Sequence, residues 1–271
     1  MRTLIFGDVV GRSGRNLVYE LLPILRRNHD VDFVIVNGEN AAGGFGITPK
    51  ICGEFFKAGA DVVTTGNHVW DQKNIYPYIE KEKRLLRPNN YPEGTPGTGI
   101  GQYTDLSGRR VLVLHFMGSL FMPPIGDPFA GVKLALINRN LIKDFAAIIL
   151  DFHGEATSEK MAMGHMLDGR VSAVVGTHSH IPTADHQILP NGTAYITDIG
   201  MCGDYDSVIG MKKEGSIARF LKQVPSPRLE PAIKEATICA VLIETNDKTG
   251  KATSIAPLRT KGCLQSVALF N

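Results

Sequence analysis

Short runs of β-branched residues alternate with helical patterns in the first half of this chain, and this alternation restricts the fold more than any other feature. The runs are RTLIF, FVIVN and DVVTT, and the segments NLVYELLPILRRN, PKICGEFFKAG and NIYPYIEKEK follow them in turn. A repeated strand and helix is the signature of right-handed βαβ units and a largely parallel sheet. We therefore predict an α/β fold, with a helix from about Asn16 that covers one face of a sheet.

The pattern changes after Gly99, where QYTDLSGRRVLVLHFM predicts an antiparallel hairpin that turns at Ser107 and Gly108. The parallel pattern resumes with AAIILDF, a helix over residues 158–167, VSAVVGT and a strand over residues 194–197. The segment ATICAVLIETNDKTGKATSIAPLRT predicts two strands joined by a turn at residues 246–250. No repeat or linker marks a boundary, so we expect a single domain over residues 1–271, built as a sandwich of two sheets flanked by helices.

Composition excludes several classes of protein. Lysine plus arginine count 29 against 27 for aspartate plus glutamate, so the net charge of +2 creates no global field for a polyanion and any nucleic-acid contact must be local. The N-terminal apolar run is too short for a signal peptide, and no run approaches the ~20 residues that span a bilayer. We expect a cytoplasmic protein with no membrane partner.

The cysteines are Cys52, Cys202, Cys239 and Cys263. They lie far apart and form no CxxC pair, which argues against a disulfide framework and against a thiolate zinc site. We expect reduced thiols that lie mostly in the core.

Polar side chains follow five of the predicted strands at the point where each strand ends. Open α/β sheets bind their ligands at the carboxyl ends of strands, because loops can present polar groups there without interrupting the core. Carboxylate, amide and imidazole groups at these ends can therefore converge on one cavity. The residues concerned are Asp8, Glu39, Asn40, Asn67, His68, His153, Glu155, His178 and His180.

These donors favour iron, manganese, zinc or nickel over copper(I). A strand-end aspartate or asparagine alone is more often a turn or cap residue, so the prediction depends on the coincidence of all five ends. Seven ligands are too many for one tetrahedral catalytic site, whereas they suit two cations ~3.5–4 Å apart that share a bridging carboxylate. The predicted metal ligands are Asp8, Glu39, Asn40, Asn67, His153, His178 and His180.

Other features have ordinary interpretations. His29, His115, His165 and His186 lie outside this setting, and we expect them to be packing or surface residues. The glycines of GDVVGRSGR do not match a dinucleotide-binding GxGxxG motif, and no GK[ST] follows. We expect Gly11 and Gly14 to allow close backbone approach near the metal cavity, and residues 41–46 to form a loop on the substrate side.

The motifs GDVVGRSGR, NGENAAGGFGIT, TTGNHVWD, DFHGEATSEK, VVGTHSHIPTAD and ITDIGMCG occur in this order over essentially the whole chain. In them the sequence resembles the calcineurin-like metallophosphoesterases, and within these the YmdB-type family of bacterial phosphodiesterases. The resemblance implies an α-β-β-α sandwich of two mixed sheets. The wider superfamily has a DxH motif where this chain has Val10, and a bridging aspartate where it has Glu39. These departures leave the metal open, with iron expected first and manganese or zinc as alternatives.

The resemblance also implies roles for the site residues. Asp8, Glu39, Asn40 and His180 would hold one cation, while Glu39, Asn67, His153 and His178 would hold the other. A hydroxide that bridges the metals would attack phosphorus, and His68 would protonate the leaving oxygen. Asp71 could orient His68, or it could be a helix N-cap. The implied substrates are nucleotide phosphodiesters, which include 2′,3′-cyclic and 3′,5′-cyclic nucleotides, and the resemblance also implies a regulatory effect through RNA or nucleotide turnover.

Two alternatives stay open. One is a phosphomonoesterase with the same metals, and the other is a regulatory protein that binds RNA or a protein partner and has a structural metal site. The loop over residues 117–131 could be a lid, a subunit contact in a homo-oligomer, or a loop packed on its own core. Apolar side chains that could form such a contact are Phe116, just before the loop, and Phe121, Met122 and Phe129 within it.

Overall fold

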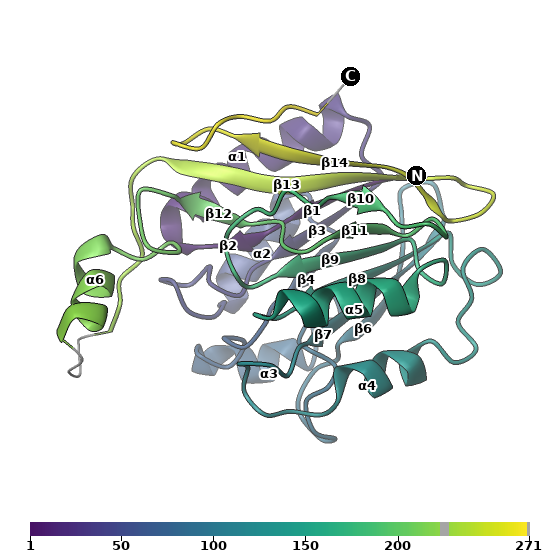
Figure 1. The fold of residues 1–271 in the computed structure, drawn as a ribbon, viewed down its shortest axis with the longest axis horizontal. Coiled ribbons are helices and arrows are strands. Elements are labelled where there is room, and N and C mark those ends of the chain that lie inside the picture. Colours follow the sequence, from purple (N-terminus) through teal and green to yellow (C-terminus); the bar gives the residue numbers. More distant parts are fainter. Residues whose placement is uncertain (223–227, 270–271) are drawn as a thin grey trace.

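Two mixed β-sheets pack face to face in the computed structural model, which describes residues 1–222 and 228–269 (Figure 1). The first sheet contains, in spatial order, β2 (Asp8–Val9), β12 (Met201–Asp204), β13 (Ala236–Thr245), β1 (Arg2–Phe6), β3 (Phe33–Asn37), β4 (Val62–Thr64) and β5 (Leu85–Leu86), and β14 (Ala252–Thr260) pairs with β13. The second sheet contains β10 (Gln187–Ile188), β11 (Ala194–Ile196), β9 (Ala173–Thr177), β8 (Ala147–His153), β7 (Arg110–Met117) and β6 (Ile100–Thr104).

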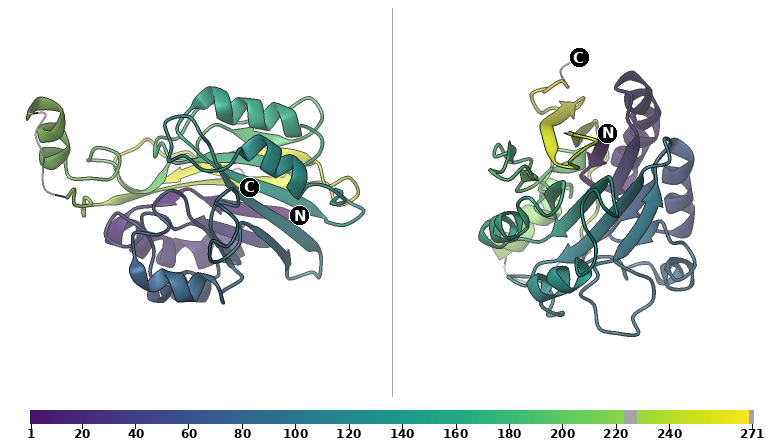
Figure 2. Two further views of the ribbon diagram at one scale, coloured as in Figure 1. Left: turned by 90° about the horizontal axis from the view of Figure 1, so that it is seen from below. Right: turned by 90° about the vertical axis from the view of Figure 1, so that its right-hand side faces the viewer.

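Helices cover the outer faces of both sheets, which makes four layers (Figure 2). The first sheet is covered by α1 (Gly11–Asn28) and α2 (Pro49–Ala58), and the second by α4 (Pro128–Ala135) and α5 (Thr157–Leu167). The short helices η1 (Lys73–Ile75) and α3 (Tyr76–Ile79) follow β4. The structure therefore confirms the predicted sandwich of two mixed sheets flanked by helices.

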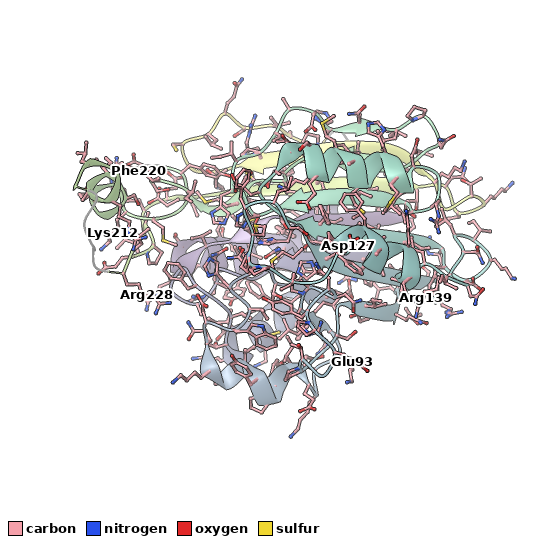
Figure 3. The ribbon with its side chains drawn as sticks, turned by 60° about the horizontal axis from the view of Figure 1, so that its bottom comes forward. Glu93, Asp127, Arg139, Lys212, Phe220 and Arg228 are labelled. Atoms are coloured by element: carbon pink, nitrogen blue, oxygen red, sulfur yellow. The ribbon has the colours of Figure 1, made fainter. Side chains whose placement is uncertain are left out.

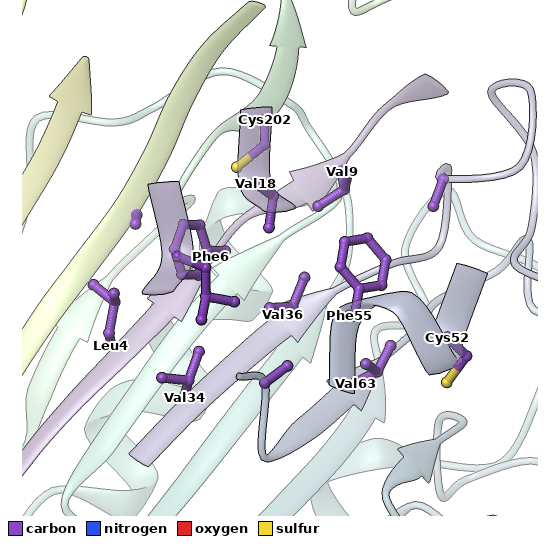
Figure 4. Packing of buried hydrophobic residues seen from close by; sticks show 14 of the residues in the cluster. Leu4, Phe6, Val9, Val18, Val34, Val36, Cys52, Phe55, Val63 and Cys202 are labelled. Atoms are coloured by element: carbon purple, nitrogen blue, oxygen red, sulfur yellow. The ribbon is translucent and has the colours of Figure 1, made fainter. Parts of the chain in front are cut away.

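Alternate side chains along the strands pack into separate apolar layers. In β1, Leu4 and Phe6 pack toward the helices with Val18 of α1 and Phe55 of α2 (Figure 4). Ile5 points the other way, into a cluster between the sheets. A third cluster lies between the second sheet and helices α4 and α5. Strands that are buried on both faces have apolar side chains at consecutive positions, which explains the continuous runs in the sequence.

The predicted central strands and both predicted hairpins are confirmed, and two helices need correction. The polar segment after Val10 is helical, so α1 begins at Gly11 and not near Asn16. The segment NIYPYIEKEK forms only η1 and α3. Only Ile75 and Ile79 of its first six residues are buried, and so little apolar surface cannot support a longer helix.

The loop over residues 117–131 is partly structured. Its last residues begin helix α4, where the Asp127 side chain accepts hydrogen bonds from two backbone N–H groups (Figure 3). Glu159 of α5 accepts from the backbone N–H of Ser119 at 2.8 Å. Phe129 packs on Phe152, whereas Phe121 at the tip is 90% exposed. Packing on the core is therefore confirmed for one part of the loop, and a lid or subunit contact stays a prediction for its tip.

Helix α6 (Lys213–Lys222) projects from the sandwich, with Phe220 exposed on it (Figures 2 and 3). The sequence analysis made no prediction for this helix. In the described part of the chain, no helix has the length and apolar character needed to cross a membrane. The single domain over residues 1–271 stays a prediction, and residues 223–227, 270 and 271 lie outside the description.

Candidate metal centre

The sheets bring the predicted strand ends to one edge of the sandwich. In the first sheet, β1, β3 and β4 are parallel neighbours, and their carboxyl ends lead into Asp8, Glu39 and Asn67. In the second sheet, β8 ends at His153 and its parallel neighbour β9 leads into His178. The centre is therefore assembled from both sheets, as five converging strand ends predict.

Two groups of ligand atoms meet at this edge and share one carboxylate. Asp8, Glu39 and His180 form the first group, and Glu39, His153 and His178 form the second. Within each group the potential ligand atoms lie within 4.8 Å of one another. Glu39 is the only residue in both groups, so the described residues place a carboxylate where a bridge between two cations would lie.

The second group converges on Nε2 of His153. This atom lies 3.2 Å from Oε2 of Glu39, 3.0 Å from Oδ1 of Asn67 and 3.1 Å from Nδ1 of His178. Each of these neighbours offers a lone pair, so a single proton on Nε2 of His153 can form a hydrogen bond with only one of them. Such an arrangement of oxygen and nitrogen donors suits a divalent transition-metal ion.

Two buried oxygen atoms, one in the first group and one on the residue that follows Glu39, have no hydrogen-bond partners in the described part of the structure. Among the described residues, Oδ1 of Asp8 and Oδ1 of Asn40 have none. Asn40 uses its Nδ2 to donate to Gly44 O at 3.0 Å, and His180 uses its Nδ1 toward Ile209 O at 2.8 Å. Buried polar atoms are normally paired, so the unpaired oxygen of Asp8 close to the His180 imidazole fits a cation.

Electrostatics in the centre are dominated by burial and by the close charges. Burial raises the pKa of Asp8 well above its usual range, and the nearby Glu39 raises it further. Burial also acts against the charged form of His153, but Glu39 outweighs it and raises the pKa of His153 to about 9. Burial and the neighbouring His153 lower the pKa of His178 to about 3. A cation that binds here would displace the proton that His153 otherwise holds.

The backbone around the centre is unusually constrained. A Cβ atom on Gly66 would lie 2.1 Å from Oε2 of Glu39 and 2.3 Å from Nε2 of His153, so only glycine fits between β4 and the ligands. His178 and His180 have φ values of 103° and 67°, which non-glycine residues rarely adopt. Strain of this kind collects at functional sites, where the surrounding structure holds it in place.

His68 lies at the rim of the centre, with 29% of its side chain exposed. Its Nδ1 is 2.9 Å from Oδ2 of Asp71, and its ring meets the Phe45 ring edge-on with centroids 5.2 Å apart. Its backbone N–H donates to Glu39 at 3.4 Å. Of the two interpretations of Asp71, the structure supports orientation of His68, because the N-cap of η1 is Gln72.

The remaining histidines and glycines of the sequence analysis lie outside the two groups of ligand atoms, although the His115 ring lies beside that of His153, with centroids 6.3 Å apart. His29 ends α1, and His165 and His186 are exposed, as predicted. His115 is buried, and its Nδ1 lies 3.1 Å from Asp151 O. Gly14 makes the predicted close approach, but its partner is the backbone of β12, where an added Cβ would lie 2.0 Å from Cys202 O.

Several buried polar residues next to the centre were missed by sequence reasoning. All but Asp198, which follows β11, stand inside strands or helices that looked like plain scaffold, so only their spatial pairing could reveal them. They are Asn37, Thr64, Asp151, Lys160, Thr177 and Asp198.

This chain is similar to known proteins over most of its length. A family model described as "YmdB-like protein" matches residues 4–258. A protein of Bacillus subtilis (strain 168) named 2′,3′-cyclic-nucleotide 2′-phosphodiesterase is 48% identical over 255 residues, which cover 94% of this chain and 95% of the relative.

Two crystal structures are similar over nearly all of the chain. A hypothetical protein from Thermus thermophilus superposes with a TM-score of 0.90 at 41% identity, covering 97% of this chain and 100% of the other. A novel phosphatase from Mycoplasma pneumoniae superposes with a TM-score of 0.89 at 33% identity, covering 96% and 93%.

Proposed function

Because this chain belongs to the YmdB-like protein family, we propose that it is a dinuclear metal-dependent phosphodiesterase that hydrolyses 2′,3′-cyclic nucleotides. The observation that carries the proposal is the position of Glu39, which is common to both groups of ligand atoms. The name of the Bacillus subtilis relative supports the substrate class. The layered sheets support the finer assignment to the calcineurin-like fold, and 3′,5′-cyclic nucleotides are a second candidate substrate.

The proposed ligand sets follow the two groups. One cation would be held by Asp8, Glu39, Asn40 and His180, and the other by Glu39, Asn67, His153 and His178. The unpartnered oxygens of Asp8 and Asn40 support the first set. The lone pairs that converge on His153 Nε2 support the second. Iron is our first candidate, and manganese and zinc suit the same donors.

Two bound cations would stabilise negative charge on the phosphoryl oxygens and supply a nucleophile from water near neutral pH. His68 would hold the proton for the leaving oxygen. With its Nδ1 directed to Asp71 at 2.9 Å, a protonated ring has its other proton on Nε2, free to transfer. The edge contact with Phe45 limits rotation of the ring. His68 is the catalytic residue of this proposal.

The proposed setting is the cytoplasm. Cys52, Cys202 and Cys239 are buried, Cys263 is exposed, and all four are free thiols, as predicted. Reduced thiols are typical of cytosolic proteins. Two further proposals are a homo-oligomer, with the loop over residues 117–131 as the subunit contact, and an effect on RNA turnover, which the sequence resemblance implies.

The test combines elemental analysis with parallel hydrolysis assays. We expect two transition-metal ions per chain, and faster hydrolysis of 2′,3′-cyclic AMP and bis-p-nitrophenyl phosphate than of 3′-AMP and p-nitrophenyl phosphate. Preference for the monoesters would identify a phosphomonoesterase instead. A metal-loaded protein that hydrolyses none of these compounds would favour the regulatory binding protein.

A further inference from the structure

The carboxylate of Asp151 joins the two sheets beside the metal centre. Asp151 lies on β8, two residues before His153, and is 1% exposed. From the first sheet, Thr64 Oγ1 donates to its Oδ2 at 2.6 Å and Asn37 Nδ2 donates at 3.3 Å. From the neighbouring strand β9, Thr177 Oγ1 donates to its Oδ1 at 2.8 Å. A buried carboxylate that accepts from three strands is held in one orientation.

The direction of these hydrogen bonds determines which nitrogen of His153 carries a proton. A threonine hydroxyl has one proton, and that of Thr177 is donated to Asp151. The Thr177 oxygen can therefore only accept from Nδ1 of His153, which lies 2.9 Å away. With a proton on Nδ1, neutral His153 has its lone pair on Nε2, the atom that faces Glu39 and the other ligands.

No other contact in the described structure takes over this role. The β8–β9 register places His153 directly opposite Thr177, so the two side chains lie on the same face. Both residues are 0% exposed, so bulk water does not reach Nδ1. The remaining neighbour of Nδ1 is Asp8 Oδ1 at 3.8 Å, which is beyond hydrogen-bond distance.

We propose that Thr177 and Asp151 are positioning residues that fix the tautomer of His153, and that they thereby set the affinity of the cation site formed by Glu39, His153 and His178. The inference rests on the proposed function, because it requires a cation in that site. Partners that orient a ligating histidine typically change metal affinity by about 10–100-fold when removed. Both residues are buried, and their hydrogen bonds lead to the centre through His153.

The test uses the full-length protein loaded with Zn²⁺, which is diamagnetic. Thr177→Val removes the hydroxyl with little change of shape, and Thr177→Ser retains it. Thr193→Val is the matched control, because Thr193 is also 0% exposed and its hydroxyl donates to Val171 O at 2.7 Å, away from the centre. Zn²⁺ affinity is measured by competition with a chromophoric chelator, and unfolding is followed for every variant by circular dichroism.

We expect Thr177→Val to weaken the affinity of one of the two Zn²⁺ ions by about 10–100-fold. Thr177→Ser should stay close to the wild type, and Thr193→Val should lose stability but keep both ions. In ¹H–¹⁵N spectra of ¹⁵N-histidine protein, the His153 Nδ1–H signal, assigned by its loss in His153→Gln, should be present in the wild type and in Thr177→Ser. It should be absent or displaced in Thr177→Val.

Two results would overturn the inference alone. In the first, wild type and Thr177→Val bind both ions equally and show the same His153 tautomer. In the second, Thr177→Ser is as defective as Thr177→Val, which would mean that the methyl packing matters and the hydroxyl does not. A wild-type protein that binds no cation at all would overturn both this inference and the proposed function. The wild-type titration therefore separates the two failures.

Discussion

The Nζ atom of Lys160 lies 2.8 Å from Oδ2 of Asp198, with side-chain exposures of 2% and 0%. The same oxygen of Asp198 accepts from the backbone N–H of Ser179 at 3.0 Å, between the two histidines of that loop. A buried ion pair of this kind matters most when one partner is removed, because the other charge is left without compensation.

We expect Lys160→Met to lower the free energy of unfolding by about 3–5 kcal/mol. Urea titration of metal-free protein measures this change. Lys213→Met is the control, because the pair of Lys213 and Asp206 is exposed and its loss should have little effect. Equal losses for the two variants would show that Lys160 is not buried as described.

Replacement of Glu39 should affect both cations. We expect Glu39→Gln to lose both ions, because the residue belongs to both ligand groups, whereas His180→Ala should lose only the ion of the first group. Metal content after gel filtration measures this difference. Glu54→Gln, a change on α2 where Glu54 accepts from Tyr19 at 3.1 Å, is the control and should retain both. Full occupancy in Glu39→Gln would rule out the bridge.

Loss of the proton donor should depend on the leaving group. We expect His68→Ala to lower turnover of 2′,3′-cyclic AMP by about 10²–10⁴-fold with unchanged metal content. The loss should be much smaller for bis-p-nitrophenyl phosphate, because p-nitrophenolate leaves without protonation. Steady-state assays of both substrates measure the difference. His165→Ala, at an exposed histidine of α5, is the control. A loss that is equal for both substrates would remove His68 from the role of acid.

Asp185 gives a prediction for the pH dependence of stability. Burial acts to raise the pKa of Asp185, but hydrogen bonds from Thr183 and Thr197 outweigh it, and the net pKa lies below the usual value. A lowered folded-state pKa contributes stability above the unfolded-state pKa of about 3.9. This stability is lost as the pH falls through the folded-state value. Asp185→Asn should therefore be less stable than wild type at pH 5–7, and the gap should narrow below about pH 4.

The gap is measured by urea unfolding of both proteins in EDTA, so that release of metal does not contribute. A gap that stays constant from pH 7 to pH 3 would mean that the charge of Asp185 is not the source of the stability.

One cysteine should react much faster with a thiol reagent than the other three. Burial raises the pKa of Cys52 to about 12 and that of Cys239 to about 11, and it raises the pKa of Cys202 as well. Because the thiolate is the reactive form, only exposed Cys263 should react quickly with a disulfide reagent at pH 8. Cys263→Ser should abolish the fast reaction, and denaturant should release the other three thiols. Two fast thiols in the native protein would contradict the described burial.

The convergence of the predicted site residues could be anticipated from the sequence because their chemistry is visible locally. Asp8, Glu39 and His178 each follow a run of apolar strand residues, and such runs end at the edge where ligands bind. The residue type and its position at a strand end were sufficient to single out these residues, and no interatomic distance was needed. The metal roles themselves stay predictions until ions are measured.

The supporting residues could not be predicted in the same way. Thr177 reads as an ordinary β-branched strand residue, and Asp151 stands within the apolar run AAIILDF. Their importance depends on the register that pairs Thr177 with His153, and on Thr64 from the opposite sheet. Short strands such as β12 and the projecting helix α6 were missed because their patterns are too brief or too polar to distinguish from loops.

The origin of the ligands in two different layers has a consequence for folding. Asp8 and Glu39 come from one sheet, and His153 and His178 come from the other. Ions at this edge would therefore cross-link the two sheets, which otherwise meet through apolar contacts. An ion that binds only the closed sandwich stabilises it by mass action. The supply of metal would then govern how long a molecule survives, in addition to how fast it works.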